Sequence, residues 1–163
     1  MAPPITGPLA KLQSYITALR LVGKGGVKRV SRAVAEEAKT LIDDGFARGI
    51  APDGTKWPPL RFRSGQPLRD SGRLQRSLAP VDTGTGFRAS TNLVYAALHQ
   101  YGGKIKARGK TLYDRRTKTA FGKSVRIPAR RFLPRDGGAL PARWSRGLNE
   151  AATEAIAIML RTR

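Results

Sequence analysis

The segment VKRVSRAVAEEAKTLIDDGFAR, residues 27–48, carries the clearest structural pattern in this chain of 163 residues. Its apolar side chains recur at helical spacing, at Val27, Val30, Val34, Ala38, Leu41 and Phe46. The opposite face is charged, with Arg32, Glu36, Lys39 and Asp43. The segment therefore predicts an amphipathic helix that buries one stripe in a hydrophobic core.

Two further helical patterns lie at the ends of the chain. The first follows Pro8, and its apolar positions are Leu9, Leu12, Ile16 and Leu19. The motif GKGG (Gly23–Gly26) ends that pattern. The second begins near Leu140, with a predicted buried face of Trp144, Leu148, Ala152, Ile156 and Met159. We therefore expect N-terminal helices within residues 1–48 and a C-terminal helix over residues 139–163.

The part between these helices, residues 49–134, is built from shorter units. APDGTKWPPL (residues 51–60) is rich in turn residues. Residues 68–78 predict a short helix with Asp70 or Ser71 as its N-cap. Residues 79–91 predict a β-hairpin around the sequence DTGTG.

A second short helix is expected in NLVYAALHQYG, residues 92–102. Asn92 is its candidate cap, Gly102 is its stop, and Val94, Ala97 and Leu98 share a helical face. His99, the one histidine of the chain, lies near the end of this helix, where a protonated ring or a ring N–H would suit exposed carbonyl groups.

Positive charge is concentrated after this helix. From Lys104 to Arg131 the chain has eleven Lys and Arg residues and one acid, Asp114, which is half of the total net charge of +20. β-type residues such as Ile105, Phe121 and Val125 are interspersed among these charges. We interpret residues of about 104–127 as an extended basic β-hairpin arm.

Composition limits the class of protein. Apolar residues make up 40% of the chain, which fits a single folded domain over residues 1–163, and no apolar run is long enough for a membrane span. The absence of cysteine suits synthesis in a reducing cytoplasm. The net charge of +20 attracts nucleic acid or acidic protein surfaces.

Catalysis is a poor interpretation of this composition. His99 would need a serine such as Ser71 or Ser77 and an acid such as Asp70 or Asp82, and no serine lies in a nucleophile-elbow pattern. The acids form no cluster at metal-ligand spacing, and GKGGVK lacks the phosphate-loop pattern. We therefore expect no enzyme activity, no metal and no cofactor.

Four ordered blocks in the middle of the chain carry a family resemblance. They are PDGTKWPPL after Phe46, PLRDSGRLQRSL, STNLVYAALHQYGG and IPARRFLP, between residues 46 and 134. Their order resembles the phage virion morphogenesis family, which includes tail-completion or tail-terminator proteins of Mu-like phages and prophages. The N-terminal helices and most of the basic arm lie outside the strongest resemblance.

The resemblance implies an α+β fold, in which an antiparallel β-sheet is packed by two or three long helices. It implies a structural virion protein of the phage neck that completes or terminates the tail tube and joins tail to head. The subunit would form a ring with itself, expected to be a hexamer. Its other partners would be the tail tube protein, a head–tail connector or stopper protein, and DNA in the lumen. The protein would be made in the host cytoplasm and reside in the virion.

Candidate contact residues follow from the resemblance and from the charge pattern. The assembly candidates are Tyr95, His99, Tyr101, Arg130 and Phe132. The candidates for contact with DNA or an acidic partner are Lys104, Lys106, Arg108, Lys110, Arg115 and Arg116. Packing within one subunit is the alternative role for the assembly candidates, and Trp57 is expected in the core.

A different functional class also fits the charge. A basic nucleic-acid-binding protein, such as a packaging or nucleoid factor, would use the same lysines and arginines on phosphates, with Tyr113 and Phe121 stacking on bases. The basic arm is equally compatible with docking on an acidic protein.

Overall fold

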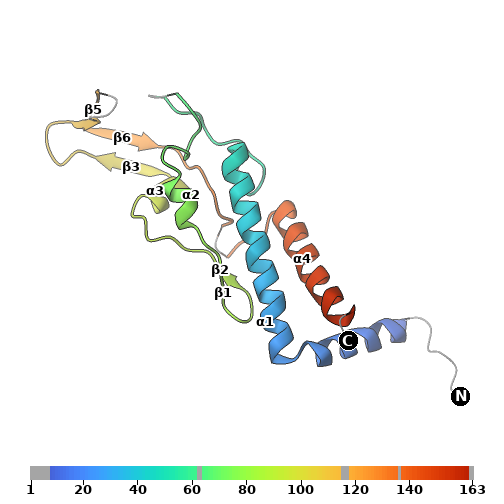
Figure 1. The fold of residues 1–163 in the computed structure, drawn as a ribbon. Helices are drawn as coiled ribbons and strands as arrows, with labels where there is room; N and C mark the ends of the chain where they lie inside the picture. The colour runs from blue at the N-terminus through green and yellow to red at the C-terminus, as the bar shows by residue number, and fades with distance from the viewer. Residues whose placement is uncertain (1–7, 62–63, 115–117, 136, 162–163) are drawn as a thin grey trace, which may run out of the picture.

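The computed structural model describes residues 8–61, 64–114, 118–135 and 137–161, and the side chains of residues 8–22 and 24 are outside that description. Helix α1 (Pro8–Arg48) changes direction at Gly23, and the part that follows packs side by side with helix α4 (Ala142–Arg161) (Figure 1). Between them the chain forms α2 (Arg73–Ser77), β1 (Val81–Asp82), β2 (Phe87–Arg88), α3 (Ala96–Tyr101), β3 (Gly103–Lys106), β4 (Leu112–Asp114), β5 (Thr119–Gly122) and β6 (Ser124–Ile127). The fold is therefore mixed α+β.

Helix α1 contains a break where the sequence predicted one. Gly23 has φ 36° and ψ −173°, outside the helical region, and a positive φ of this kind favours glycine. The side chains of the helical pattern before it, from Leu9 to Leu19, lie outside the described residues. The break separates that pattern from the amphipathic part of the helix.

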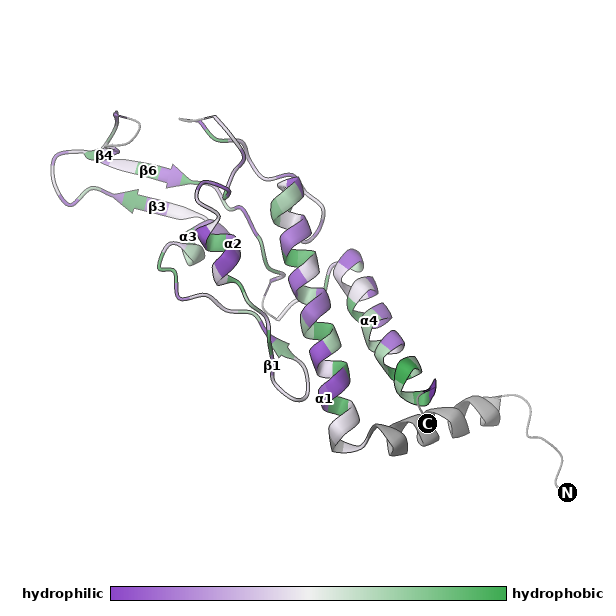
Figure 2. Cartoon of the chain, viewed as in Figure 1, coloured by the Kyte–Doolittle hydropathy of each residue, from purple (hydrophilic) through white to green (hydrophobic). Residues whose placement is uncertain are grey.

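The amphipathic part of α1 buries half of its predicted stripe, and Val30 and Val34 are half-buried. Ala38, Leu41 and Phe46 are buried, and Figure 2 shows apolar and polar patches alternating along this helix. Val27 is 39% exposed, so its inclusion in the buried stripe was wrong. Ile42, which the predicted stripe omitted, is buried at 1% exposure.

Helix α4 packs closely on α1 because a glycine lies at the contact. A Cβ on Gly147 would come within 2.8 Å of Glu37 Oε1 and 3.5 Å of Leu41 Cδ1. Arg143 of α4 also donates to the carboxylate of Asp44 on α1. The predicted buried face of α4 is confirmed at Trp144 and Leu148, whereas Ala152, Ile156 and Met159 are only half-buried.

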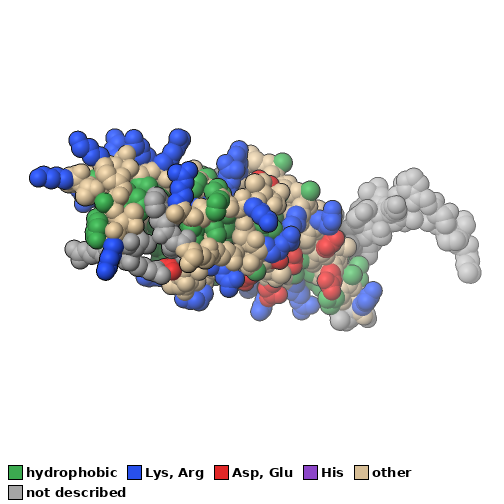
Figure 3. All heavy atoms as spheres, turned by 90° about the horizontal axis from the view of Figure 1, so that it is seen from above, with side chains coloured by type: hydrophobic (Ala, Val, Ile, Leu, Met, Phe, Trp, Pro, Cys, Tyr) green, Lys and Arg blue, Asp and Glu red, His purple; other side chains and the backbone are tan. Residues whose placement is uncertain are grey.

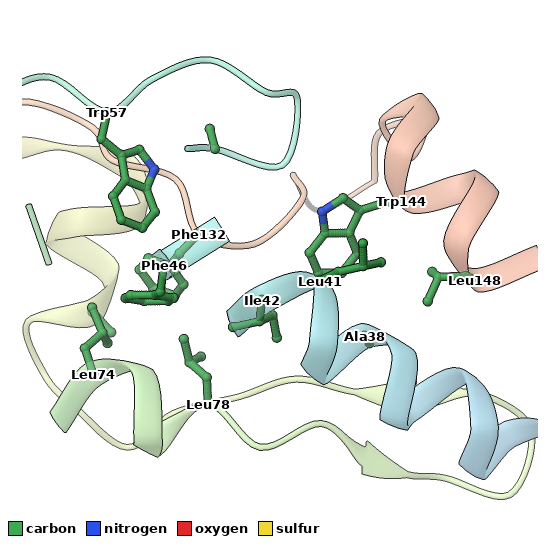
Figure 4. Close-up of a cluster of buried hydrophobic side chains, with 12 residues drawn as sticks. Ala38, Leu41, Ile42, Phe46, Trp57, Leu74, Leu78, Phe132, Trp144 and Leu148 are labelled. Carbon is green, nitrogen blue, oxygen red and sulfur yellow. The ribbon is translucent and has the colours of Figure 1, made fainter. Parts of the chain in front are cut away.

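The centre of the core is an aromatic cluster around Phe46 (Figure 4). The ring centroid of Phe46 lies 5.3 Å from that of Trp57, in an edge-to-face contact, and 5.9 Å from that of Phe132. Trp57 Nε1 donates a hydrogen bond of 2.7 Å to the carbonyl of Arg131. Trp57 is thus a core residue, as predicted, and it fixes the turn-rich segment against residues 131–132.

The strands form three separate two-stranded sheets among the described residues, which corrects the expectation of one antiparallel sheet. β1 pairs antiparallel with β2, confirming the hairpin around DTGTG. β3 pairs with β6, and β4 pairs with β5. A two-stranded pair as short as these is marginally stable by itself, and β1 and β2 pack against α1.

Two predicted helix caps were wrong. α2 is preceded by Gly72 in a left-handed conformation, with φ 68°, instead of being capped by Asp70 or Ser71. α3 starts after Tyr95, and the turn before it is stabilised by Thr91, whose Oγ1 accepts from the N–H of Leu93 at 3.2 Å. The first short helix is therefore started by a left-handed glycine, and the second by a turn that the side chain of Thr91, and not the predicted Asn92, stabilises.

Candidate interaction site

The end of α3 holds the segment 130–133 through a buried glutamine. Gln100 Oε1 accepts hydrogen bonds from the N–H groups of Phe132 at 3.0 Å and Leu133 at 3.1 Å. Its Nε2 donates to the carbonyl of Leu133 at 2.8 Å. One side chain thus satisfies three backbone groups that would otherwise be buried without partners.

Arg130 connects the same segment to the loop of residues 58–59. Its N–H donates to the carbonyl of His99 at 2.7 Å. Its guanidinium donates from Nε to the carbonyl of Pro58 at 2.8 Å and from Nη2 to that of Pro59 at 2.9 Å. The guanidinium thus makes a forked pair of hydrogen bonds, and the acceptors of both are backbone carbonyls inside the subunit.

His99 lies half-buried beside Arg130. Its Nδ1 is buried and has no hydrogen-bond partner among the described residues, and its ring stands edge-on to Tyr95 at 5.9 Å between centroids. Burial, followed by the positive charge of Arg130, holds the pKa of His99 below its ordinary value. A neutral ring is therefore favoured, which is the second of the two expected alternatives, a ring N–H, over a protonated ring.

The pKa of His99 gives the first prediction. As the pH falls through 6.5, the unfolded chain takes up a proton that the folded ring resists. Stability is therefore expected to be constant above that pH and to fall between it and the lower pKa of the folded state. An NMR titration of the single histidine should give a midpoint below 6.5, and urea unfolding should show the matching loss.

The control for this prediction is His99→Leu, which removes the titrating group. Its stability should lack the fall that begins as the pH drops below 6.5. A midpoint above 6.5 in the native protein would contradict the burial argument, since it would mean that the folded state favours the imidazolium.

The arm, residues 103–127, leaves the body at two glycines, Gly102 and Gly103, which form its root. Gly102 has φ 73°, and a Cβ there would lie 2.9 Å from the Ala129 nitrogen and 3.1 Å from the Ile127 oxygen. A Cβ on Gly103 would lie 2.7 Å from Leu98 Cδ1. The predicted stop of α3 at Gly102 is confirmed. The close approach explains why the backbone can leave α3 and enter β3 directly.

The first ladder of the arm has two chemically different faces. Ile105 lies opposite Val125, and Lys104 lies opposite Arg126. Because residues directly opposite each other in an antiparallel pair share a face, Ile105 and Val125 make one face and Lys104 and Arg126 the other. The sequence patterns KIK and SVRI already show this alternation of apolar and polar residues, but the two faces were not predicted from it.

A groove of about 720 Å³ lies between the apolar face of the arm and the body. The body contributes Pro59, Leu60, Arg61, Leu68, Asp70, Ser71, Gly72, Arg73, Leu74, Tyr95, His99 and Arg130, and the arm side contributes Ile105, Leu112, Tyr113, Asp114, Phe121, Val125, Arg126, Ile127 and Pro128. The groove thus brings together four segments that are far apart in the sequence.

The outer side of the arm is strongly basic. Lys104, Lys106, Arg108 and Lys110 are all exposed, and Arg115 and Arg116 lie outside the described residues. Figure 3 shows Lys and Arg side chains around this end of the molecule, while most of the visible acidic side chains lie over the helical part. The arm therefore presents positive charge to solvent and apolar side chains to the groove.

The five assembly candidates lie in different environments. Tyr95 and Tyr101 are 41% and 61% exposed, so both are available for contacts. Arg130 and Phe132 are buried at 6% and 5% and pack within the subunit. The sequence reasoning missed Gln100, because its predicted face for α3 was Val94, Ala97 and Leu98. The buried residues of α3 are instead Ala96 and Gln100.

The described residues contain neither a metal-ligand cluster nor a membrane-spanning helix. No group of three or more His, Asp or Glu side chains there is arranged to hold a metal ion. No described helix is long and apolar enough to cross a membrane.

Comparison with known proteins places these features in a family. No solved structure is significantly similar to this chain. The curated Mu-like prophage FluMu G protein 2 of Haemophilus influenzae is 29% identical over 123 residues, which cover 74% of this chain and 77% of that protein. Residues 9–163 match the phage virion morphogenesis family. Because that match spans almost the whole sequence, the chain belongs to the phage virion morphogenesis family.

Proposed function

We propose that this protein is a structural component of the phage neck, which completes or terminates the tail tube and joins the tail to the head. The observation that carries the proposal is the match to the virion morphogenesis family over residues 9–163. The similarity to a Mu-like prophage protein supports a role in a tailed phage of that type. The role requires no catalysis, only surfaces that bind neighbouring proteins.

The subunits would assemble as a ring, expected to be a hexamer, between the tail tube protein and a head–tail connector or stopper protein. Copies with a charge of +20 repel one another, so the ring would be stabilised by acidic partners or by DNA in its lumen. The arm would act as an extended basic β-hairpin, with its lysines available to such partners. The exposed Tyr95 and Tyr101 are further candidates for contacts between neighbours.

Deletion of the gene from the phage that encodes it tests this role. We expect filled heads and tails to accumulate separately, because the surface that joins them is missing, and infectious particles to fall by several orders of magnitude. Negative-stain electron microscopy of the lysate measures the first effect and a plaque assay the second.

A plasmid copy of the native gene should restore joined particles. Cryo-electron microscopy of those particles should show the protein as a ring at the head-proximal end of the tail. Joined, infectious particles in the absence of the gene would contradict the proposal, and so would density for this protein only at another location.

A further inference from the structure

The floor of the groove is suited to apolar side chains. The apolar face of the arm contributes Ile105 and Val125, and the body contributes Leu60 and Leu68. The volume of about 720 Å³ lies within the range of about 300–1,000 Å³ that is typical of sites burying a small ligand. Ile105 is 37% exposed, so apolar surface remains open to solvent in the isolated subunit.

Leu68 shows that the backbone is strained at this groove. Its φ is 62°, in the left-handed region that costs a leucine about 1–2 kcal/mol. The side chain is half-buried, packs against the core and lines the groove. Strain of this kind persists where the surrounding structure fixes a residue, and it is concentrated at binding sites.

Positive charge dominates the rim. Arg61, Arg73 and Arg126 line the groove and are exposed, while Arg130 lies buried beside them. Two acids, Asp70 and Asp114, also line the groove, so its charged residues sum to a positive value. An occupant that carries carboxylates is therefore electrostatically favoured over a neutral or basic one.

The composition of the groove discriminates between the possible occupants. A second copy of the chain is disfavoured because it also carries a charge of +20. Its carboxylates at Asp43 and Asp44 are already paired with Lys39, Arg48 and Arg143, which leaves them poorly placed to contact the arginines of the groove. Nucleic acid could stack on Tyr95, Tyr113 and Phe121, which also line the groove, but it would gain little from the aliphatic side chains there, because its binding comes from phosphate contacts and base stacking. A peptide supplies both apolar side chains and carboxylates.

We infer that the groove beneath the arm binds an extended acidic peptide segment of a neighbouring virion protein. Apolar side chains of that segment enter between the arm and Leu68, and its carboxylates contact Arg61 and Arg73 at the rim. Binding would then cover the exposed part of Ile105. That the peptide belongs to a virion protein rests on the proposed function, whereas the chemistry of the peptide follows from the groove itself.

Selection from a library of random short peptides displayed on yeast tests this inference with the purified full chain. Peptides enriched on the native protein should be rich in Asp and Glu and should carry apolar residues. The binding site is then located by NMR, since the imidazole signals of His99 come from the only histidine and that ring lines the groove. An enriched peptide should shift these signals at saturation.

Two substitutions on one strand provide a matched pair. Ile105→Ser removes apolar surface from the groove face, and Lys106→Ser removes a charge next to it on the outer face. Both residues are exposed, so neither change endangers the fold. We expect Ile105→Ser to weaken the selected peptides by about tenfold or more, and Lys106→Ser by less than about threefold.

Three results would overturn the inference. They are the absence of enriched acidic peptides, equal weakening by the two serine variants, and a stronger shift of the His99 signals by single-stranded DNA than by any peptide. The last result would assign the groove to nucleic acid. None of these outcomes depends on phage particles. A failed peptide selection therefore leaves the deletion phenotype intact, and a failed deletion phenotype leaves peptide binding intact.

Discussion

Phe46→Ala is expected to lower the free energy of unfolding by about 3–5 kcal/mol. Phe46 has no exposed surface and contacts Trp57 and Phe132, so its removal leaves a cavity between three parts of the chain that are far apart in sequence. A domain of this size has a total stability of about 5–15 kcal/mol, so a loss of this size is a large share of the total. Urea unfolding followed by tryptophan fluorescence measures the effect directly, because Trp57 reports on the cavity.

Phe46→Leu is the matched control. It keeps most of the buried volume and is expected to cost about 1.5 kcal/mol. A loss of less than about 2 kcal/mol for the alanine variant would mean that the core collapses around the cavity. In that case the aromatic cluster would not be the centre of the fold.

Gln100→Leu is expected to lower the stability by about 3 kcal/mol. Leucine fills a similar volume but leaves the N–H groups of Phe132 and Leu133, and the carbonyl of Leu133, without their partner. Each buried polar group left unsatisfied costs about 1–3 kcal/mol, and partial entry of water offsets some of the sum. Hydrogen exchange by NMR should show the amides of Phe132 and Leu133 exchanging faster.

Gln75→Leu controls for the loss of a glutamine as such. Gln75 is half-buried, and among the described residues its side chain donates one hydrogen bond, of 2.9 Å, to Asp43, which Lys39 also contacts. This change should cost less than about 1 kcal/mol. Equal losses in the two variants would show that the three hydrogen bonds of Gln100 contribute nothing beyond an ordinary surface contact.

Helical periodicity predicted the largest elements of this fold well. The amphipathic part of α1, the break at Gly23 and the start of α4 all follow from residue spacing, because these segments bury one face over many turns. The errors are Val27, which is at the start of the segment, and Ile42, which lies four residues from both Ala38 and Phe46 and therefore within the stripe. Helix α1 is covered by α4 on one side and by the aromatic cluster on another, which makes its buried face wider near Ile42 (Figure 4).

The candidate site could be predicted only in part. Aromatic and charged side chains in STNLVYAALHQYGG and IPARRFLP were identified as a set, and the structure brings these two segments together through His99, Gln100 and Arg130. Their roles were not predictable, because a glutamine that bonds to backbone looks like a surface glutamine in sequence. In α3 the apolar spacing pointed to Val94, which is 96% exposed.

The groove was beyond sequence reasoning for a geometric reason. Its walls come from residues 59–61, 68–74, 95–99 and the arm, and no local pattern tells how such segments approach one another. The alternation in β3 and β6 was visible, but each strand has only four residues, and the register shift between Leu112 and Tyr113 interrupts the pattern in β4. The two faces of the arm therefore became clear only from the pairing.

The root of the arm also determines how mechanical force would enter the subunit. Both strands of the first ladder attach to the body at the same end, through Gly103 and Ile127. A pull on the tip would therefore load the bonds of Gln100 and the bond from Arg130 to His99 at the same time. Hydrogen bonds that are loaded at the same time require a larger force to break than hydrogen bonds that are loaded one after another. Because the connection at Gly102 is short, a force applied to the arm would thus be transmitted to the body beside the core.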